Sequence, residues 1–105
     1  FSPGDLLKLA IAGCNAMSSD TRLASRLGDD FAQFVGVSAD YDGDADRFTH
    51  VEVELVQDLS ALDEQEQADL IRRAEAAIKR NCTIEHSVVD RALPSHHAFT
   101  SERID

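Results

Sequence analysis

The feature that most constrains the fold is a long helical pattern in the first quarter of the chain. Apolar and small residues recur at steps of three or four, and Leu7 and Ile11 widen this stripe. The segment 2–5 predicts the helix start, since Ser or Asp caps a helix and Pro suits its first turn. Gly28 is a suitable stop, so we expect the helix to reach about Arg26. Its first half is apolar nearly all round, which predicts a central, buried helix. The recurring positions are Leu6, Ala10, Gly13, Cys14, Met17 and Thr21.

Two alternating runs follow and predict a β-hairpin. The runs cover residues 31–41 and 48–57, and each places apolar side chains on one face. Residues 42–46, with the sequence Asp-Gly-Asp-Ala-Asp, form a turn cluster between them. Glu52 and Glu54 share one face of the second run, which indicates a solvated sheet face rather than an acid pair.

A second helix is predicted after the hairpin. Asp63 and Glu66 have the spacing of a capping box, and Lys79 and Arg80 stand near the C-terminal end, where the helix dipole favours cations. The pairs Arg72-Arg73 and Lys79-Arg80 are typical of charge that keeps a helix solvated. The predicted buried stripe is Leu70, Ile71, Ala74, Ala77 and Ile78.

The tail carries a weaker signal. The pattern of residues 87–93 is ambiguous, Pro94 breaks whatever precedes it, and residues 97–100 are compatible with a short strand. The order helix, hairpin, helix, tail predicts an α+β domain, with helices packed on an antiparallel sheet. Two strands make a poor sheet. We therefore expect upstream strands or a second subunit to complete it.

Length and charge bound the possible functions. At 105 residues the chain is expected to be a single domain, 1–105, and its start at Phe1 without Met suggests N-terminal truncation. The net charge of −10 argues against nucleic acid and anionic membranes as partners. No apolar run is long enough for a bilayer, and the start does not resemble a secretory signal. We therefore expect a cytoplasmic protein.

The two cysteines are the main candidates for chemistry. Cys14 and Cys82 stand 68 residues apart, which fits neither a disulfide scaffold nor a zinc site. On the apolar face of the first helix, Cys14 is either a small buried hydrophobe or a nucleophilic thiolate. A thiolate that attacks a hydroperoxide becomes a sulfenic acid, which a second thiol can convert to a disulfide. Cys82, just after the second helix, is the candidate for that second thiol.

Metal sites are weaker alternatives. Asp40, Asp42, Asp44 and Asp46 resemble the start of a calcium loop, but the required Gly and the closing Glu are missing, so a hairpin turn is expected. Three histidines, together with Cys82, are conceivable zinc ligands, yet neighbouring histidines in a polar tail are more often solvated. We expect neither a metal nor a cofactor. The three histidines are His86, His96 and His97.

Two motifs resemble the OsmC/Ohr family of hydroperoxide reductases. Residues 2–7, Ser-Pro-Gly-Asp-Leu-Leu, followed by 10–14, Ala-Ile-Ala-Gly-Cys, are similar to its first cysteine motif. Residues 81–87, Asn-Cys-Thr-Ile-Glu-His-Ser, are similar to its second. The resemblance spans residues 2–90 and includes the order of the elements between the motifs. It implies an OsmC-like α+β fold, an intertwined homodimer, and N-terminal strands that precede this chain.

The resemblance also implies roles for individual residues. Cys14 corresponds to the peroxidatic cysteine and Cys82 to the resolving cysteine of a cytoplasmic, antioxidant bacterial enzyme. The substrates implied are organic hydroperoxides, and the reductant is a dithiol or a lipoyl-type protein. The family's activating Glu corresponds to Gly4 here, with Asp5 as the nearest possible substitute. The family's activating Arg comes from the N-terminal segment.

Two other functions remain open at this point. Gly4 at the position of the activating Glu favours a non-catalytic OsmC-like protein with a stress or ligand-binding role. An accessory subunit or fragment, completed by strands of another chain, is a further alternative.

Overall fold

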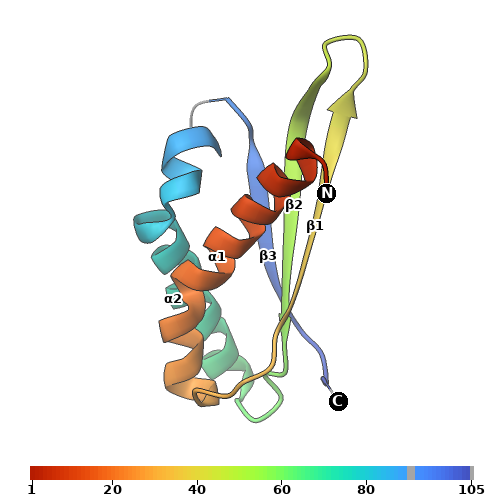
Figure 1. Ribbon diagram of the computed structural model, residues 1–105. Helices are drawn as coiled ribbons and strands as arrows, with labels where there is room; N and C mark the ends of the chain where they lie inside the picture. Colours follow the sequence, from red (N-terminus) through yellow and green to blue (C-terminus); the bar gives the residue numbers. More distant parts are fainter. Residues whose placement is uncertain (90–91, 105) are drawn as a thin grey trace.

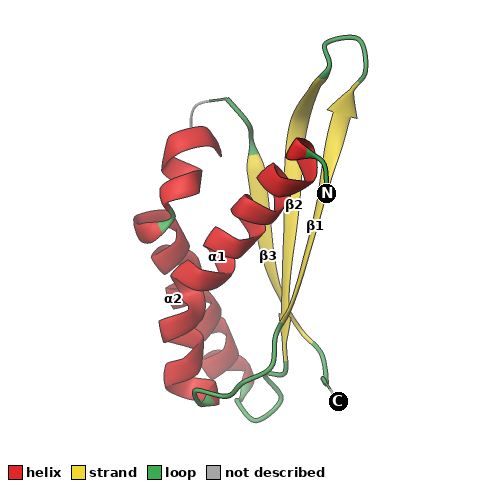
Figure 2. Ribbon diagram, in the orientation of Figure 1, coloured by secondary structure: helices red, strands yellow, loops and turns green. Residues whose placement is uncertain are grey.

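The computed structural model describes residues 1–89 and 92–104, and it has two layers (Figures 1 and 2). Both long helices lie on one side of a sheet, so the predicted α+β arrangement is confirmed. None of the helices in this part of the chain combines the length and apolarity needed to cross a bilayer. The elements are α1 (Pro3–Leu27), β1 (Phe34–Asp42), β2 (Arg47–Gln57), α2 (Glu64–Asn81), the π-helical turn η1 (Glu85–Val89) and β3 (Ser95–Ser101).

The sheet has the order β1-β2-β3 and is mixed rather than wholly antiparallel. β1 and β2 form the predicted antiparallel hairpin. β3, which comes from the tail, pairs parallel to β2, and this corrects the expectation of a purely antiparallel sheet. Parallel neighbours need a long crossover, and α2 with η1 provides it. The third strand is therefore supplied by the tail itself.

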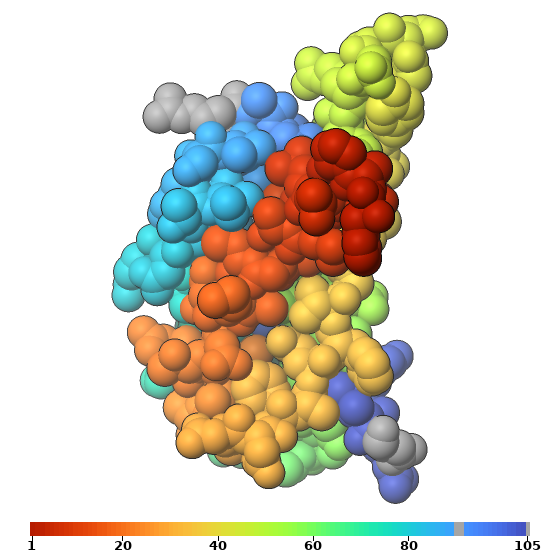
Figure 3. Space-filling view, viewed as in Figure 1, coloured from red at the N-terminus to blue at the C-terminus, as the bar shows by residue number. Residues whose placement is uncertain are grey.

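The acidic cluster forms the hairpin turn, as predicted. The Asp42 carboxylate accepts hydrogen bonds from the backbone N–H groups of Asp44 (3.0 Å) and Ala45 (3.2 Å). Asp46 has a φ of 52°, in the left-handed region that Asp tolerates in turns. In the space-filling view this tip extends beyond the helical layer (Figure 3).

Both helices begin with capping boxes. Ser2 and Asp5 exchange side-chain to backbone hydrogen bonds at the start of α1, and Asp63 and Glu66 do the same at the start of α2. Such caps satisfy backbone N–H groups that have no partner within the helix. The predicted stripe of α2 is confirmed, with Ile71 only partly buried. Its wholly buried members are Leu70, Ala74, Ala77 and Ile78.

The core lies between α1 and the central strand. Val51, Val53 and Leu55 of β2 point into it, whereas Glu52 and Glu54 stay exposed on the outer face. The buried face of α1 differs from the predicted stripe. Because α1 is apolar nearly all round, periodicity alone did not identify the face that packs. The buried positions of α1 are Ile11, Ala12, Asn15, Ser19 and Leu23.

Part of the predicted stripe is on the surface. Leu6 is 57% exposed, Leu9 46% and Met17 80%. The described residues therefore leave an apolar face of α1 uncovered, and Cys14 lies at its border.

Candidate functional site

Cys14 is half-buried on α1 and opens into an apolar hollow. The hollow has a volume of about 640 Å³ and lies between α1 and the end of α2. Its walls are mainly hydrocarbon, with a few hydroxyl and amide groups. A hollow of this size and polarity suits a small organic ligand. The lining residues are Leu9, Ala10, Gly13, Cys14, Met17, Ser18, Thr21, Asn81 and Ile84.

Cys82 is the C-cap residue of α2 and is completely buried. Its backbone N–H donates to the carbonyl of Ile78 at 2.9 Å, which ends the helix at this residue. Its thiol points back toward α1, where it donates to the Asn15 carboxamide oxygen, with Sγ and Oδ1 3.8 Å apart. The backbone N–H of Glu85 donates to the same sulfur at 3.4 Å. Helix termination thus sets the position of this thiol against α1.

The environment keeps Cys82 in its protonated form. Burial is the largest of several effects that together raise the pKa of the Cys82 thiol to about 12. The Cys14 thiol contributes to this rise, through a hydrogen-bonding interaction and, more weakly, through repulsion between the two negative charges. The hydrogen bond from the Glu85 N–H lowers the pKa, but this effect is smaller than that of burial. The two free thiols, distant in sequence, are therefore close enough for Cys14 to affect the pKa of Cys82, and Cys82 remains a neutral thiol at neutral pH.

The two thiols should differ sharply in their rate of alkylation. Iodoacetamide reacts with thiolates, and a pKa near 12 instead of 9.0 reduces the thiolate of Cys82 about a thousandfold at pH 8. In the folded protein at pH 8 we expect mass spectrometry to show alkylation of Cys14 before any of Cys82. In urea, where burial is lost, both should react at similar rates. Equal rates in the folded protein would contradict this description of Cys82.

Two polar residues beside the thiols, each with a buried side-chain atom, carried no signal in the sequence. Asn15 is 0% exposed, and its Nδ2 has no hydrogen-bond partner among the described residues. Glu85, one turn after Cys82, has a buried Oε2 that is also unpaired within the described part of the chain. Unpaired buried polar groups are costly, and they concentrate at functional sites. Both residues stand at ordinary positions within helical segments, so a single sequence does not distinguish them from residues without a role in the site.

Asp5 lies away from both sulfur atoms. It precedes Cys14 by nine residues, which is two and a half helical turns, or about 13.5 Å of rise and the opposite face of α1. Its carboxylate is used by the capping box with Ser2 and by an ion pair with Lys8 at 3.4 Å. These contacts lower the pKa of Asp5, the backbone N–H of Ser2 having the largest effect. The structure therefore does not bring Asp5 to the thiols, and we assign it to the helix start.

No metal centre is found in residues 1–89 and 92–104, where no three His, Cys, Asp or Glu side chains converge on a common point suitable for an ion. The histidines have other contacts. The carboxylate of Glu52 pairs with His50 at 2.6 Å and with His96 at 2.9 Å, while His86 contacts the carbonyl of Lys79 at 2.6 Å. The pairs with His50 and His96 lower the pKa of Glu52.

The comparison with protein families identifies the chain. A family model described as OsmC-like protein matches residues 1–96, which is most of the sequence. The chain belongs to the OsmC-like family. This OsmC-like chain is 43% identical over all 105 residues to uncharacterized proteins of Mycobacterium tuberculosis and Mycobacterium bovis, and it spans 73% of their length.

Solved structures share the fold of this OsmC-like chain. A putative osmotic stress induced and detoxification response protein from Psychrobacter arcticus has a TM-score of 0.68 at 21% identity, with 95% of this chain and 68% of that chain covered. An OsmC like protein from Mycoplasma pneumoniae gives 0.65 at 12% identity, with 98% and 73% covered. The organic hydroperoxide resistance protein OhrB of Bacillus subtilis gives 0.53 at 17% identity, with 94% and 70% covered. These likenesses confirm the predicted OsmC-like fold.

One position of this OsmC-like chain stands out at the start of α1. Gly4, where the resemblance would place a carboxylate, packs beneath the Phe48 ring, and a Cβ atom there would lie 3.1 Å from the Phe48 Cζ atom. Lys8 lies over the same ring, 5.7 Å from its centroid. A larger residue at position 4 would require the ring to shift by a few tenths of an ångström. The glycine is therefore part of a tight contact between α1 and β2.

Proposed function

We propose that the chain is a thiol-dependent peroxidase that reduces organic hydroperoxides, with Cys14 as the peroxidatic and Cys82 as the resolving cysteine. The observation that carries this proposal is the proximity of two free thiols that stand 68 residues apart in sequence: Cys14 is near enough to raise the pKa of Cys82, and Cys14 lines an apolar hollow. Membership of the OsmC-like family supports it. An apolar hollow favours alkyl or aryl hydroperoxides over hydrogen peroxide, because burial of hydrocarbon contributes to binding.

The first step forms a sulfur–oxygen bond at Cys14. The Cys14 thiolate attacks the terminal peroxide oxygen, the O–O bond breaks, and the alkoxide leaves as an alcohol after it takes up a proton. Sulfur is oxidised by two electrons to a sulfenic acid, and the hydroperoxide is reduced by two. The apolar walls offer a surface for the hydrocarbon part of the substrate, and Ser18 and Thr21 provide hydroxyl groups in the lining.

The second step forms the disulfide. The Cys82 sulfur attacks the Cys14 sulfur, the S–O bond breaks, and the hydroxyl group leaves as water with the proton that Cys82 gives up. Conversion of Cys14 to a neutral sulfenic acid removes the thiolate charge that raises the pKa of Cys82. The resolving thiol thus becomes slightly easier to deprotonate once the first has reacted, while burial, the largest cause, still raises its pKa. A dithiol or lipoyl-type reductant would then return the disulfide to two thiols.

The direct test is turnover. Purified protein with cumene hydroperoxide and a dithiol should consume the peroxide and oxidise the dithiol in equal amounts. A ligand-binding OsmC-like protein without catalysis is the second candidate, favoured by the packing of Gly4 beneath Phe48 where a carboxylate would be expected. Binding of the peroxide's alcohol, without peroxide consumption or thiol oxidation, would favour that candidate.

We also propose that the chain forms a homodimer. Its apolar face on α1, with Leu6, Leu9 and Met17, is uncovered and adjoins Cys14. Burial of such a face yields about 25 cal/mol per Å² of apolar surface. Sedimentation equilibrium should give twice the chain mass of 11.5 kDa, and a monomer at micromolar concentration would rule the proposal out.

A further inference from the structure

A second hollow lies between α1 and α2, and its character is cationic. It has a volume of about 380 Å³, and α1 provides Arg22 and Ser25 to its walls. From α2 come Arg73 and Arg80, with two alanines between them. Three of the chain's ten Lys and Arg residues thus gather in one groove, and no acidic residue lines it. In a chain with a net charge of −10, this concentration of positive charge calls for an explanation.

The positive charge is poorly compensated. Neither Arg22 nor Arg80 has an ion pair within the described residues. Arg73 has one, through its Nε atom to Asp69 at 3.2 Å, but it shares that carboxylate with Arg72. Guanidinium groups in a common groove repel one another, and each offers a planar set of donors that matches a carboxylate or a phosphate. An anion in this groove would remove the repulsion and use those donors.

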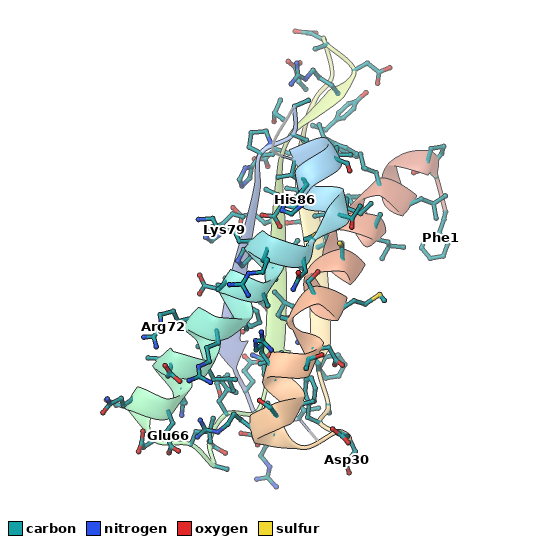
Figure 4. All side chains as sticks on the ribbon, turned by 90° about the vertical axis from the view of Figure 1, so that its left-hand side faces the viewer. Phe1, Asp30, Glu66, Arg72, Lys79 and His86 are labelled. Atoms are coloured by element: carbon teal, nitrogen blue, oxygen red, sulfur yellow. The ribbon has the colours of Figure 1, made fainter. Side chains whose placement is uncertain are left out.

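The cationic groove adjoins the hollow at Cys14. Thr21 and Asn81 line the hollow at Cys14, and their neighbours in sequence, Arg22 and Arg80, line the cationic groove. α1 and α2 run side by side over this region (Figure 4). Arg22 follows Cys14 by eight residues, which is about 12 Å along the helix. A ligand that reaches both must therefore be elongated, with an apolar part toward Cys14 and an anionic part toward the arginines.

We propose that Arg22, Arg73 and Arg80 form an anion subsite of the Cys14 site. The ligand class is an amphiphilic hydroperoxide, with the reacting group on its apolar chain and a carboxylate or phosphate at its end. This inference rests on the proposed function, because it takes a hydroperoxide to be the group that meets Cys14. The subsite selects among hydroperoxides by charge, whereas the apolar hollow selects by shape.

The test compares a long-chain fatty acid hydroperoxide with its methyl ester, which has the same chain but no charge. In the wild-type protein we expect kcat/KM for the acid to exceed that for the ester about tenfold, the effect of one charged hydrogen-bonded pair. In the double variant Arg22→Gln, Arg80→Gln the ratio should fall to about one. The preference should also weaken with added salt. Equal rates for acid and ester in the wild type, or a preserved ratio in the double variant, would overturn the subsite.

Arg72→Gln is the matched control. Arg72 lies on the same helix but points away from α1 (Figure 4), and its partner is Asp69. This variant should keep both rates and their ratio. Loss of the preference in Arg72→Gln would mean that the net charge of the protein, rather than the groove, makes the selection, and the subsite would again be overturned.

Calorimetric binding separates this inference from the proposed function. The corresponding hydroxy acid cannot react, so its binding does not depend on peroxidase chemistry. If it binds the wild type but not the double variant, the subsite stands, even where cumene hydroperoxide is not consumed. If cumene hydroperoxide is consumed but the hydroxy acid binds both proteins equally, the subsite fails and the peroxidase stands. If inorganic phosphate binds as tightly as the hydroxy acid, the apolar chain contributes nothing to affinity, and the proposal of an amphiphilic ligand is overturned.

Discussion

Replacement of Cys14 by serine is expected to abolish hydroperoxide consumption. A hydroxyl group stays protonated at neutral pH and is a poor nucleophile toward a peroxide, whereas a thiolate attacks directly. The rate with cumene hydroperoxide and a dithiol should fall by a factor on the order of 10³ or more. Because Cys14 is half-buried and serine is of similar size, the variant should keep the fold.

Cys82→Ser is the matched comparison. Here Cys14 can still react with the peroxide, so one equivalent should be consumed quickly and a sulfenic acid should accumulate, which a dimedone adduct would reveal. Further turnover should depend on slower attack by the external thiol. An undiminished rate in Cys14→Ser would mean that another group reduces the peroxide, and the assignment of both cysteines would be lost.

Replacement of Leu55 by alanine is expected to destabilise the fold strongly. Leu55 is 0% exposed on the central strand, where it is paired in register with Val35 of β1 and Phe99 of β3 and packs against the buried face of α1. Removal of three carbon atoms from such a site costs about 2–5 kcal/mol, a large part of the 5–15 kcal/mol typical of a domain. The free energy of unfolding in urea measures the effect.

Glu54→Ala provides the control for that measurement. Glu54 is the adjacent residue on the exposed face of the same strand. Its replacement should change the unfolding free energy by no more than about 0.5 kcal/mol. Equal losses at positions 54 and 55 would show that β2 does not divide the sheet into a core face and a solvated face.

The elements with strong periodicity were predictable from the sequence. The alternation around the 42–46 turn gave the hairpin. The cap and proline of residues 2–5 gave the first helix start, and the capping-box spacing of Asp63 and Glu66 gave the second. The buried face of α1 was not predictable, because a helix that is apolar nearly all round has no single core stripe. The pairing of β3 was not predictable either. Residues 95–101 alternate weakly, and their parallel register with β2 depends on the crossover through α2.

The candidate site was predictable only in part. The resemblance of two short motifs singled out Cys14 and Cys82, and the fold places Cys14 close enough to raise the pKa of the Cys82 thiol. The resemblance offered Asp5 only as the nearest substitute for the activating Glu, and an offset of one residue rotates a side chain by about 100° around a helix. Asn15 and Glu85 carried no signal because burial depends on tertiary packing. The pairs that contain Arg73 and Arg80 suggested solvated charge, and only the approach of Arg22 on α1 shows that they line a groove.

Oxidation of the reduced protein by one equivalent of cumene hydroperoxide, without any reductant, tests the central claim most directly. Mass spectrometry of the intact chain should show the loss of two hydrogen atoms, and peptide mapping should show a bond between Cys14 and Cys82. Two thiols that both remain reduced, or Cys14 driven to the sulfinic acid while Cys82 stays free, would contradict the account.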